Sequence, residues 1–274
     1  GNLIAWQDHF FTSTGNGRSP MTSADMGANI FPMDMTPNVR LMQTMYQNGI
    51  PTGAMRAPGS NALAFIIQGF MHELAVASGK DHVQFLLDTL VDEGPGEGPQ
   101  AMHRGRAAGV IKEVAEMAGW GKEMPAGRAL GLSFYYCHSG YVAQIADVEV
   151  NARKEVKVHK VYAAADFGLI HNLAAAENQL EGGIIDGLSQ LFTAKITFNN
   201  GEVMQRNFHQ YPMLRMVQAP ALETRFMPAG EFSPTGSGEP SMPPVLAAVT
   251  NAIFHATGER IRKMPLAELG YTLV

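Results

Sequence analysis

Apolar residues recur at every third or fourth position in several stretches of the chain, which is the spacing of one face of a helix. The clearest case is residues 61–78, where Ser60 is expected to cap the helix and Gly79 to end it. The repeating apolar positions of this helix are Leu63, Ile66, Ile67, Phe70, Met71 and Leu74. Similar patterns predict further helices over residues 82–91, 100–118, 174–192 and 244–257.

Shorter runs of aliphatic and aromatic residues predict strands between these helices. Strands are expected over residues 3–12, 129–136, 141–150, 156–164 and 223–227. Residues 39–46 fit either a strand or a short helix, and residues 195–207 fit a hairpin, because Asn-Gly suits its tight turn. Helices and strands do not alternate strictly, so the expected fold class is α+β. We divide the chain into two α+β portions, residues 1–98 and 99–274.

Two features predict that much of the surface is covered by other protein. Residues 14–37 show neither a helical nor a strand period, and loops of that length in compact domains are usually functional or form interfaces. Charged residues make up 16% of the chain, against roughly 25% in typical soluble domains. Both features indicate large interfaces, or a piece of a larger protein. The chain opens in what looks like the middle of a strand, so we expect its natural N-terminus and any targeting signal to be missing.

Charge and cysteine content exclude several classes of function. The net charge is −5 with no long basic run, which argues against nucleic acid and anionic membranes as partners. The single cysteine, Cys137, cannot form an internal disulfide or hold an iron–sulfur cluster. No apolar run reaches the roughly 18 residues of a membrane-spanning helix. The compartment stays open between the bacterial cytoplasm and the periplasm.

The stretch most suggestive of chemistry is Gly-Ser-Gly-Glu-Pro at residues 236–240, just before the last predicted helix. Its glycines allow unusual φ values and a close approach to a ligand. A rigid turn just before a helix N-terminus suits either an anionic ligand or a catalytic base, and Glu239 would be that base. Taken alone, an ordinary solvated glutamate in a surface turn is the better interpretation.

Two other residues allow a functional and a structural interpretation. Arg56 lies in a turn rich in Pro and Gly, where it could clamp a phosphate or an oxo group, or simply bond nearby carbonyls. Gln179 precedes Gly182 and Gly183 inside a predicted helix. The adjacent glycines would permit close approach to a ligand, although tight helix–helix packing is the commoner reason for them.

The usual metal and nucleophile signatures are absent from the sequence. The nine histidines form no His-x-x-x-His pair, so a zinc site held by protein ligands is not expected. Neither a Gly-x-Ser-x-Gly elbow nor a Rossmann fingerprint in its proper context is present.

Three segments, taken in order, resemble the C-terminal half of the molybdenum-binding large subunit of the xanthine dehydrogenase/aldehyde oxidase family. The resemblance is closest to the isoquinoline 1-oxidoreductase beta-subunit branch. The segments are Met-Arg-Ala-Pro-Gly at 55–59, Glu-Asn-Gln-Leu-Glu-Gly-Gly-Ile at 177–184 and Gly-Ser-Gly-Glu-Pro at 236–240. Each motif is modest, but their order and spacing over almost the whole chain are fairly specific.

The resemblance implies a molybdenum hydroxylase that uses water to hydroxylate an electron-poor carbon of an N-heterocycle or an aldehyde. Glu239 matches the catalytic base of that family. Arg56, Gln179 and Gly238 match positions that bind the cofactor, molybdenum with molybdopterin, expected in its cytosine dinucleotide form. The pterin dithiolene holds the metal, so no protein metal ligand is expected.

The same resemblance implies partners. A small iron–sulfur subunit is expected to carry 2Fe–2S clusters, and the upstream half of the molybdenum subunit is expected on the same or a separate chain. Because nothing here matches that upstream half, we expect the isolated chain to be inactive. The alternative is a non-catalytic structural or assembly domain that retains the fold.

Overall fold

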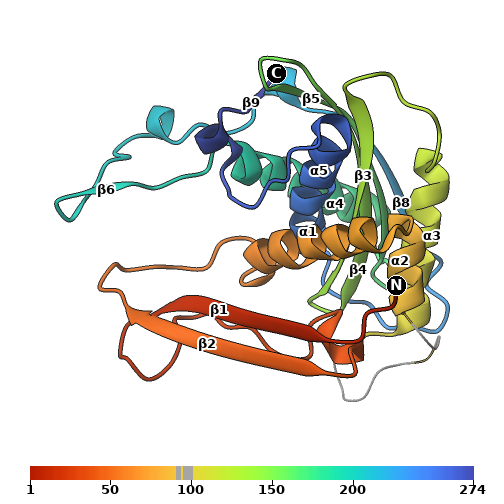
Figure 1. The fold of residues 1–274 in the computed structure, drawn as a ribbon, viewed down its shortest axis with the longest axis horizontal. Coiled ribbons are helices and arrows are strands. Elements are labelled where there is room, and N and C mark those ends of the chain that lie inside the picture. The colour runs from red at the N-terminus through yellow and green to blue at the C-terminus, as the bar shows by residue number, and fades with distance from the viewer. Residues whose placement is uncertain (91–93, 95–100) are drawn as a thin grey trace.

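A five-stranded mixed sheet forms the centre of the computed structural model, which describes residues 1–90, 94 and 101–274 (Figure 1). Its strands are β3 (Arg128–Cys137), β4 (Gly140–Val150), β5 (Glu155–Asp166), β8 (Ala221–Phe226) and β9 (Thr272–Leu273). β3, β4 and β5 pair antiparallel in sequence order, and β8 and β9 each pair parallel with β5. The predicted strands 129–136, 141–150 and 156–164 are therefore present with small shifts, and the α+β fold class is confirmed.

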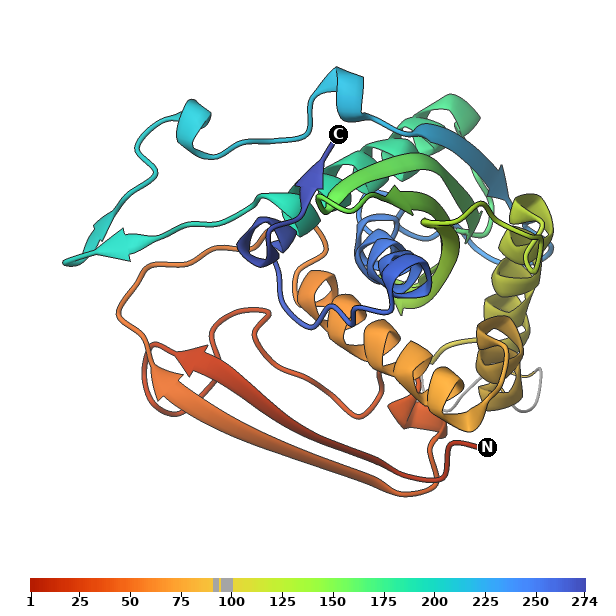
Figure 2. The same cartoon turned by 45° about the horizontal axis from the view of Figure 1, so that its top comes forward.

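The helix α5 (Met242–Thr257) runs through the middle of the molecule, with the curved sheet on one side and α1 on the other (Figure 2). Every residue from Met242 to Ile253 is buried. A helix that is apolar all round can only be stable when it is enclosed in this way. β3 passes so close that a Cβ added to Gly131 would lie 2.2 Å from the Ala252 nitrogen.

The remaining helices cover this centre. They are α1 (Ser60–Ser78), α2 (His82–Thr89), α3 (Arg104–Ala118) and α4 (Leu173–Phe192). Three of them begin within a few residues of the predicted positions, and α5 begins two residues earlier than expected. Residue 100, the predicted start of α3, and the boundary between residues 98 and 99 lie outside the described residues.

The predicted cap of α1 is wrong. Gly59, with φ of 72°, occupies the N-cap position, and Ser60 is already helical. The Ser60 hydroxyl instead forms hydrogen bonds with the side chains of Tyr135 and Cys137 on β3. A serine before an apolar period is a common cap signal, but here a positive-φ glycine turns the chain and leaves the hydroxyl facing a cavity.

A separate two-stranded sheet lies beside α1 (Figure 1). β1 (Trp6–Thr14) and β2 (Val39–Gln47) pair parallel over nine residues each, so residues 39–46 form a strand and not a helix. The buried residues of the loop between these strands include Phe31 and Met33. Both belong to the same core cluster as α1 and β3, so the predicted long loop is anchored at that end.

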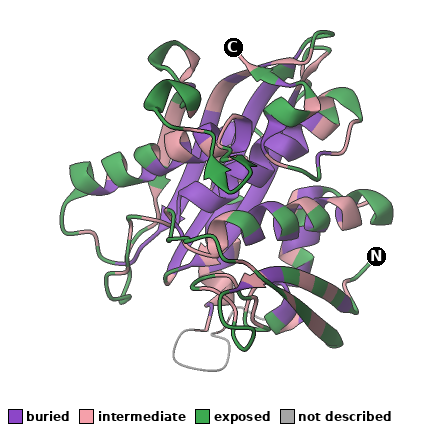
Figure 3. Cartoon of the chain, turned by 90° about the vertical axis from the view of Figure 1, so that its left-hand side faces the viewer, coloured by how far each residue is buried: buried purple, intermediate pink, exposed green. Residues whose placement is uncertain are grey.

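An extended arm follows α4 and projects from the body, with only short strands β6 (Phe198–Asn199) and β7 (Glu202–Val203) (Figure 1). The predicted hairpin is therefore present but much shorter than residues 195–207. Phe208, Met216 and Val217 on this arm are 94%, 91% and 84% exposed. The buried positions gather instead on the sheet and on α5 (Figure 3).

Within the described parts of the chain, no single helix has the length and apolarity needed to cross a membrane, although α1 and α2, bent by 106° at their junction, meet that criterion as a pair.

Candidate functional site

Arg56 joins the three segments that the sequence singled out. Its Nε donates to the Gly238 carbonyl at 2.7 Å. Its Nη2 donates to both the carbonyl and the side-chain oxygen of Gln179, each at 3.1 Å. Two of these three bonds go to carbonyls, so Arg56 has the structural role that the sequence left open. The guanidinium holds the loop before α5 against α4.

Glu239 is not a freely solvated side chain. Its Oε1 accepts the Ala57 N–H at 3.2 Å, and its Oε2 lies 3.1 Å from His138 Nε2. The side chain is 38% exposed, so the carboxylate is oriented on one side and open to solvent on the other. Ala57 is fully buried with φ of 55°, a left-handed conformation that costs free energy in a residue with a Cβ. That conformation aims its N–H at Glu239.

The two glycines of α4 have different surroundings. A Cβ on Gly183 would lie 2.0 Å from Ser241 Oγ, so this glycine permits the close crossing of α4 and the start of α5. Gly182 instead lies beside Arg56, whose Nη1 would be 3.8 Å from an added Cβ. Tight packing, the commoner reason for such glycines, therefore applies to the second glycine of the pair.

The sequence did not single out His138, which lies at the tip of the β3–β4 hairpin. Cys137 pairs with Gly140, leaving a two-residue turn whose residues, His138 and Ser139, have φ of 52° and 61°. Such turns normally favour Asn and Gly, so the usual turn signal was missing. A Cβ on Gly140 would lie 2.8 Å from the Pro240 ring. The hairpin tip thus packs on the residue after Glu239, which brings His138 to the carboxylate.

Cys137 lies on the same hairpin but has little thiolate character. It is buried, and this burial, with a smaller contribution from the Glu239 charge, raises the pKa of its thiol to about 12. A thiol that stays protonated is a poor nucleophile. Cys137 is therefore part of a cavity wall and not a candidate for covalent catalysis.

A cavity of about 280 Å³ lies at the start of α4, on the side of the site where Gln179 is found. Gln179, Ser237, Thr235 and Asn172 are among its lining residues. The Thr235 hydroxyl is buried and has no hydrogen-bond partner within the described part of the protein. Buried polar groups of folded proteins are nearly always satisfied, so this hydroxyl calls for a polar ligand or water. Together with the N-terminal end of a long helix, which favours anions, the cavity fits a phosphate-bearing, hydrogen-bonding cofactor.

No group of three or more His, Cys, Asp or Glu side chains is placed to hold a metal ion among the residues that the structure describes.

A family model described as a molybdopterin cofactor-binding domain matches residues 99–220. The chain is 30% identical over 251 residues to a nicotinate dehydrogenase subunit of Pseudomonas putida, covering 85% of this chain and 19% of that protein. It is also 30% identical over 216 residues to the isoquinoline 1-oxidoreductase beta subunit of Brevundimonas diminuta, covering 77% of this chain and 26% of the relative. The chain belongs to the xanthine dehydrogenase/aldehyde oxidase family of molybdenum-binding subunits. It spans less than a third of the length of these two relatives.

The fold agrees with this family. Quinoline 2-oxidoreductase from Pseudomonas putida 86 superimposes with a TM-score of 0.78 at 12% identity, covering 97% of this chain and 59% of that one. At that identity the likeness establishes the fold alone. Of the four residues expected at the site, Gln179 lies inside the matched domain 99–220, whereas Arg56, Gly238 and Glu239 lie outside it. The structure brings all four together; their roles toward a cofactor stay predictions.

Proposed function

We propose that this chain forms part of the catalytic subunit of a molybdenum hydroxylase, which hydroxylates an electron-poor carbon of an N-heterocycle or an aldehyde. The observation that carries the proposal is the meeting of Arg56, Gln179, Gly238 and Glu239 in one hydrogen-bonded cluster. These residues come from three distant segments, and a surface turn without a function would not require that they converge.

Gln179, with Arg56 holding its side-chain oxygen, would contact the molybdopterin cofactor from the α4 side. The unpaired Thr235 hydroxyl and the helix N-terminus supply further polar contacts there. When bound, the cofactor supplies the metal centre that activates water and accepts two electrons. The cytosine dinucleotide form, which the resemblance to the isoquinoline branch implies, is part of the proposal.

Glu239 would act as the general base. Its two oxygens are held by the Ala57 N–H and by His138, which orients the carboxylate before any substrate arrives. A base must lie within hydrogen-bond reach of the proton that it takes, so fixing its orientation favours the reaction. The Glu239 side chain stays 38% exposed, so a proton donor can still approach the carboxylate.

Partners complete the proposal. β1 and β2 form a two-stranded parallel sheet, a type that is normally covered on both faces and flanked by further strands. The exposed apolar side chains of the 193–220 arm also require cover. Both features support further protein around this chain: the upstream half of the molybdenum subunit and an iron–sulfur subunit carrying 2Fe–2S clusters.

Metal and pterin analysis of the complex purified from its native host tests the proposal. We expect one molybdenum atom and one pterin for each copy of this chain in the complex. If both are absent from an intact complex, the proposal fails, and the chain is a structural or assembly domain that has kept the fold.

A further inference from the structure

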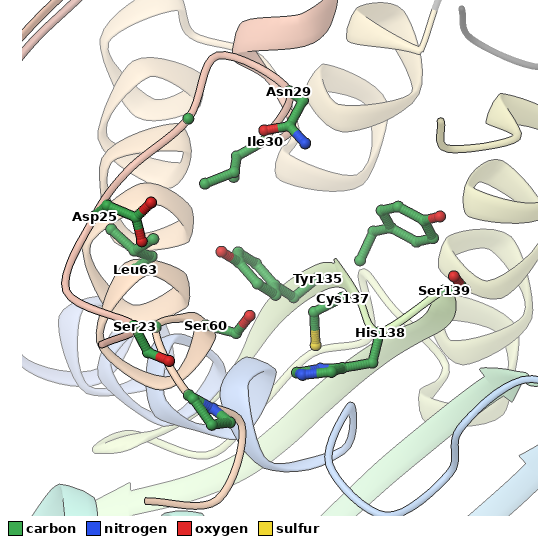
Figure 4. A pocket seen from close by; sticks show the side chains of 14 residues that line it. Ser23, Asp25, Asn29, Ile30, Ser60, Leu63, Tyr135, Cys137, His138 and Ser139 are labelled. Atoms are coloured by element: carbon green, nitrogen blue, oxygen red, sulfur yellow. The ribbon is translucent and has the colours of Figure 1, made fainter. Parts of the chain in front are cut away.

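A second cavity, of about 470 Å³, is lined in part by Pro58 and Gly59 of the Arg56 turn and shares no lining residue with the Gln179 cavity (Figure 4). One wall is the loop segment from Ser23 to Ile30, and the other is formed by the start of α1 and the β3–β4 hairpin tip. The long loop of residues 14–37, which the sequence predicts to be functional or to form an interface, therefore lines this cavity and contributes no residue to the Gln179 cavity.

The cavity lies directly beside the proposed base. His138 lines it and contacts Glu239 through its Nε2. Pro58 and Gly59 also line it, and they follow Ala57, whose N–H is bonded to the other oxygen of Glu239. A molecule bound in this cavity would therefore lie one side chain away from Glu239.

The loop wall is firmly placed. A Cβ on Gly59 would lie 3.3 Å from the Ser23 carbonyl, so the loop rests directly on the α1 turn. Thr12 Oγ1 donates to the Ala24 carbonyl at 2.6 Å, which fixes one end of the lining segment. At the other end, the Phe31 ring is buried and packs edge-on against Phe134.

The lining is polar, and among the described residues its only permanently charged side chain is a carboxylate. Asp25, Tyr135 and Ser60 turn their oxygen atoms toward the same space (Figure 4). Burial raises the pKa of Tyr135, so its hydroxyl stays protonated and can donate a hydrogen bond. Ile30 and Leu63 add an apolar surface for a ring. An anionic ligand would meet the Asp25 carboxylate and, on the described lining, no lysine or arginine, and the Glu239 charge lies one side chain farther away, behind His138.

We propose that this cavity is the substrate chamber of the enzyme, and that it accepts a neutral or cationic heterocycle and rejects an anionic one. The proposal rests on the proposed function for the meaning of "substrate", but the binding preference can be measured without turnover. Asp25 is the residue that sets this preference, since it carries the one carboxylate among the described lining residues.

The test is equilibrium dialysis with the purified complex in the absence of an electron acceptor. The probes are a pyridine and an isoquinoline, each carrying either a carboxamide or a carboxylate, so that each pair differs in charge at nearly constant shape. We expect the carboxamide to bind roughly 10-fold more tightly than the carboxylate. Asp25→Asn should reduce this ratio roughly 5-fold. The matched control Asp8→Asn, on β1 and outside the cavity lining, should leave the ratio unchanged.

Three results would overturn the inference: no binding of any of the four probes, carboxylates bound as tightly as carboxamides, or the same ratio in both variants. Molybdenum and pterin are measured on the same samples. If they are absent while the charge preference holds, the proposed function fails and the chamber stands. If they are present while the preference is missing, the chamber alone fails.

Discussion

Histidines from other elements lie near the two ends of α5, in opposite settings. Near its start, His138 is 37% exposed and contacts Glu239 at the open side of the site. Near its end, His72 and His82 are almost fully buried, at 1% and 3% exposure, and lie beside His255. The same side chain is thus used for an orienting contact at one end and as packed core at the other. Burial, and not residue type, decides which histidine is available for chemistry.

The hydrogen bonds at the buried end form one consistent chain. Arg260 can only donate, so His72 Nδ1 accepts from it at 2.7 Å, and His72 Nε2 must then carry the proton toward His255 Nε2, also at 2.7 Å. His255 Nδ1 donates to the Leu130 carbonyl at 2.9 Å. Every proton is assigned with both rings neutral. Desolvation lowers the pKa of His72 to about 2 and that of His82 to about 3.

The largest effect is expected at the open end. Glu239→Gln in the complete complex keeps the size of the side chain but removes the base, so turnover should fall by roughly 10² to 10⁴-fold. Molybdenum and pterin content should be unchanged, because the amide can still accept the Ala57 N–H. Steady-state kinetics and metal analysis check this, and near-normal turnover would rule out Glu239 as the base.

At the buried end we expect an acid-sensitive stability. The folded-state pKa values of His72 and His82 lie below the ordinary value of 6.5, so the unfolded state binds more protons as the pH falls below that value. The free energy of unfolding should then drop by about 1.4 kcal/mol per pH unit for each histidine, from pH 6.5 toward pH 3. Urea denaturation at several pH values measures this slope. His72→Gln should make it shallower, and identical slopes for both proteins would contradict the neutral cluster.

Arg56→Lys tests the link between α4 and the loop before α5. A lysine cannot form the three bonds that the guanidinium makes to Gly238 and Gln179. We expect the free energy of unfolding to fall by about 1–2 kcal/mol, together with a lower pterin content. The control is Arg153→Lys, because Arg153, in the turn between β4 and β5, forms an exposed ion pair with Glu155. If both variants lose the same free energy of unfolding and the same pterin content, Arg56 does not have a special role in linking α4 to the loop before α5.

The smallest effect is expected for the exposed histidine. His138→Ala removes one contact that orients the Glu239 carboxylate, which we expect to lower kcat roughly 3- to 10-fold, the equivalent of one hydrogen bond. His138→Gln, which can still donate, should recover most of the loss. If glutamine and alanine give equal rates, His138 does not act through a hydrogen bond.

Much of the local structure followed from the residue pattern. The apolar period of residues 61–78 and the αL glycine at 79 correctly predicted α1, and Gly258 ends α5 as expected. The prediction that Ser60 caps α1 was wrong, because Gly59, with a positive φ, occupies the N-cap position. The predicted strands of the β6–β7 hairpin were too long, since an Asn-Gly turn specifies the bend but not how many residues pair on either side of it.

The sequence by itself determined the helices and the longer strands of the centre, because hydrophobic periodicity and turn residues act within a few positions, whereas the two-residue strand β9 was not predicted. It also identified Arg56, Gln179, Gly238 and Glu239 as residues of interest, through order along the chain. Only the tertiary structure brought them together: Arg56 and Gly238 are 182 positions apart and meet through a backbone carbonyl, which any residue type would supply. His138 reaches Glu239 because Gly140 packs on Pro240. Contacts of that kind depend on how distant segments pack, and no local pattern encodes them.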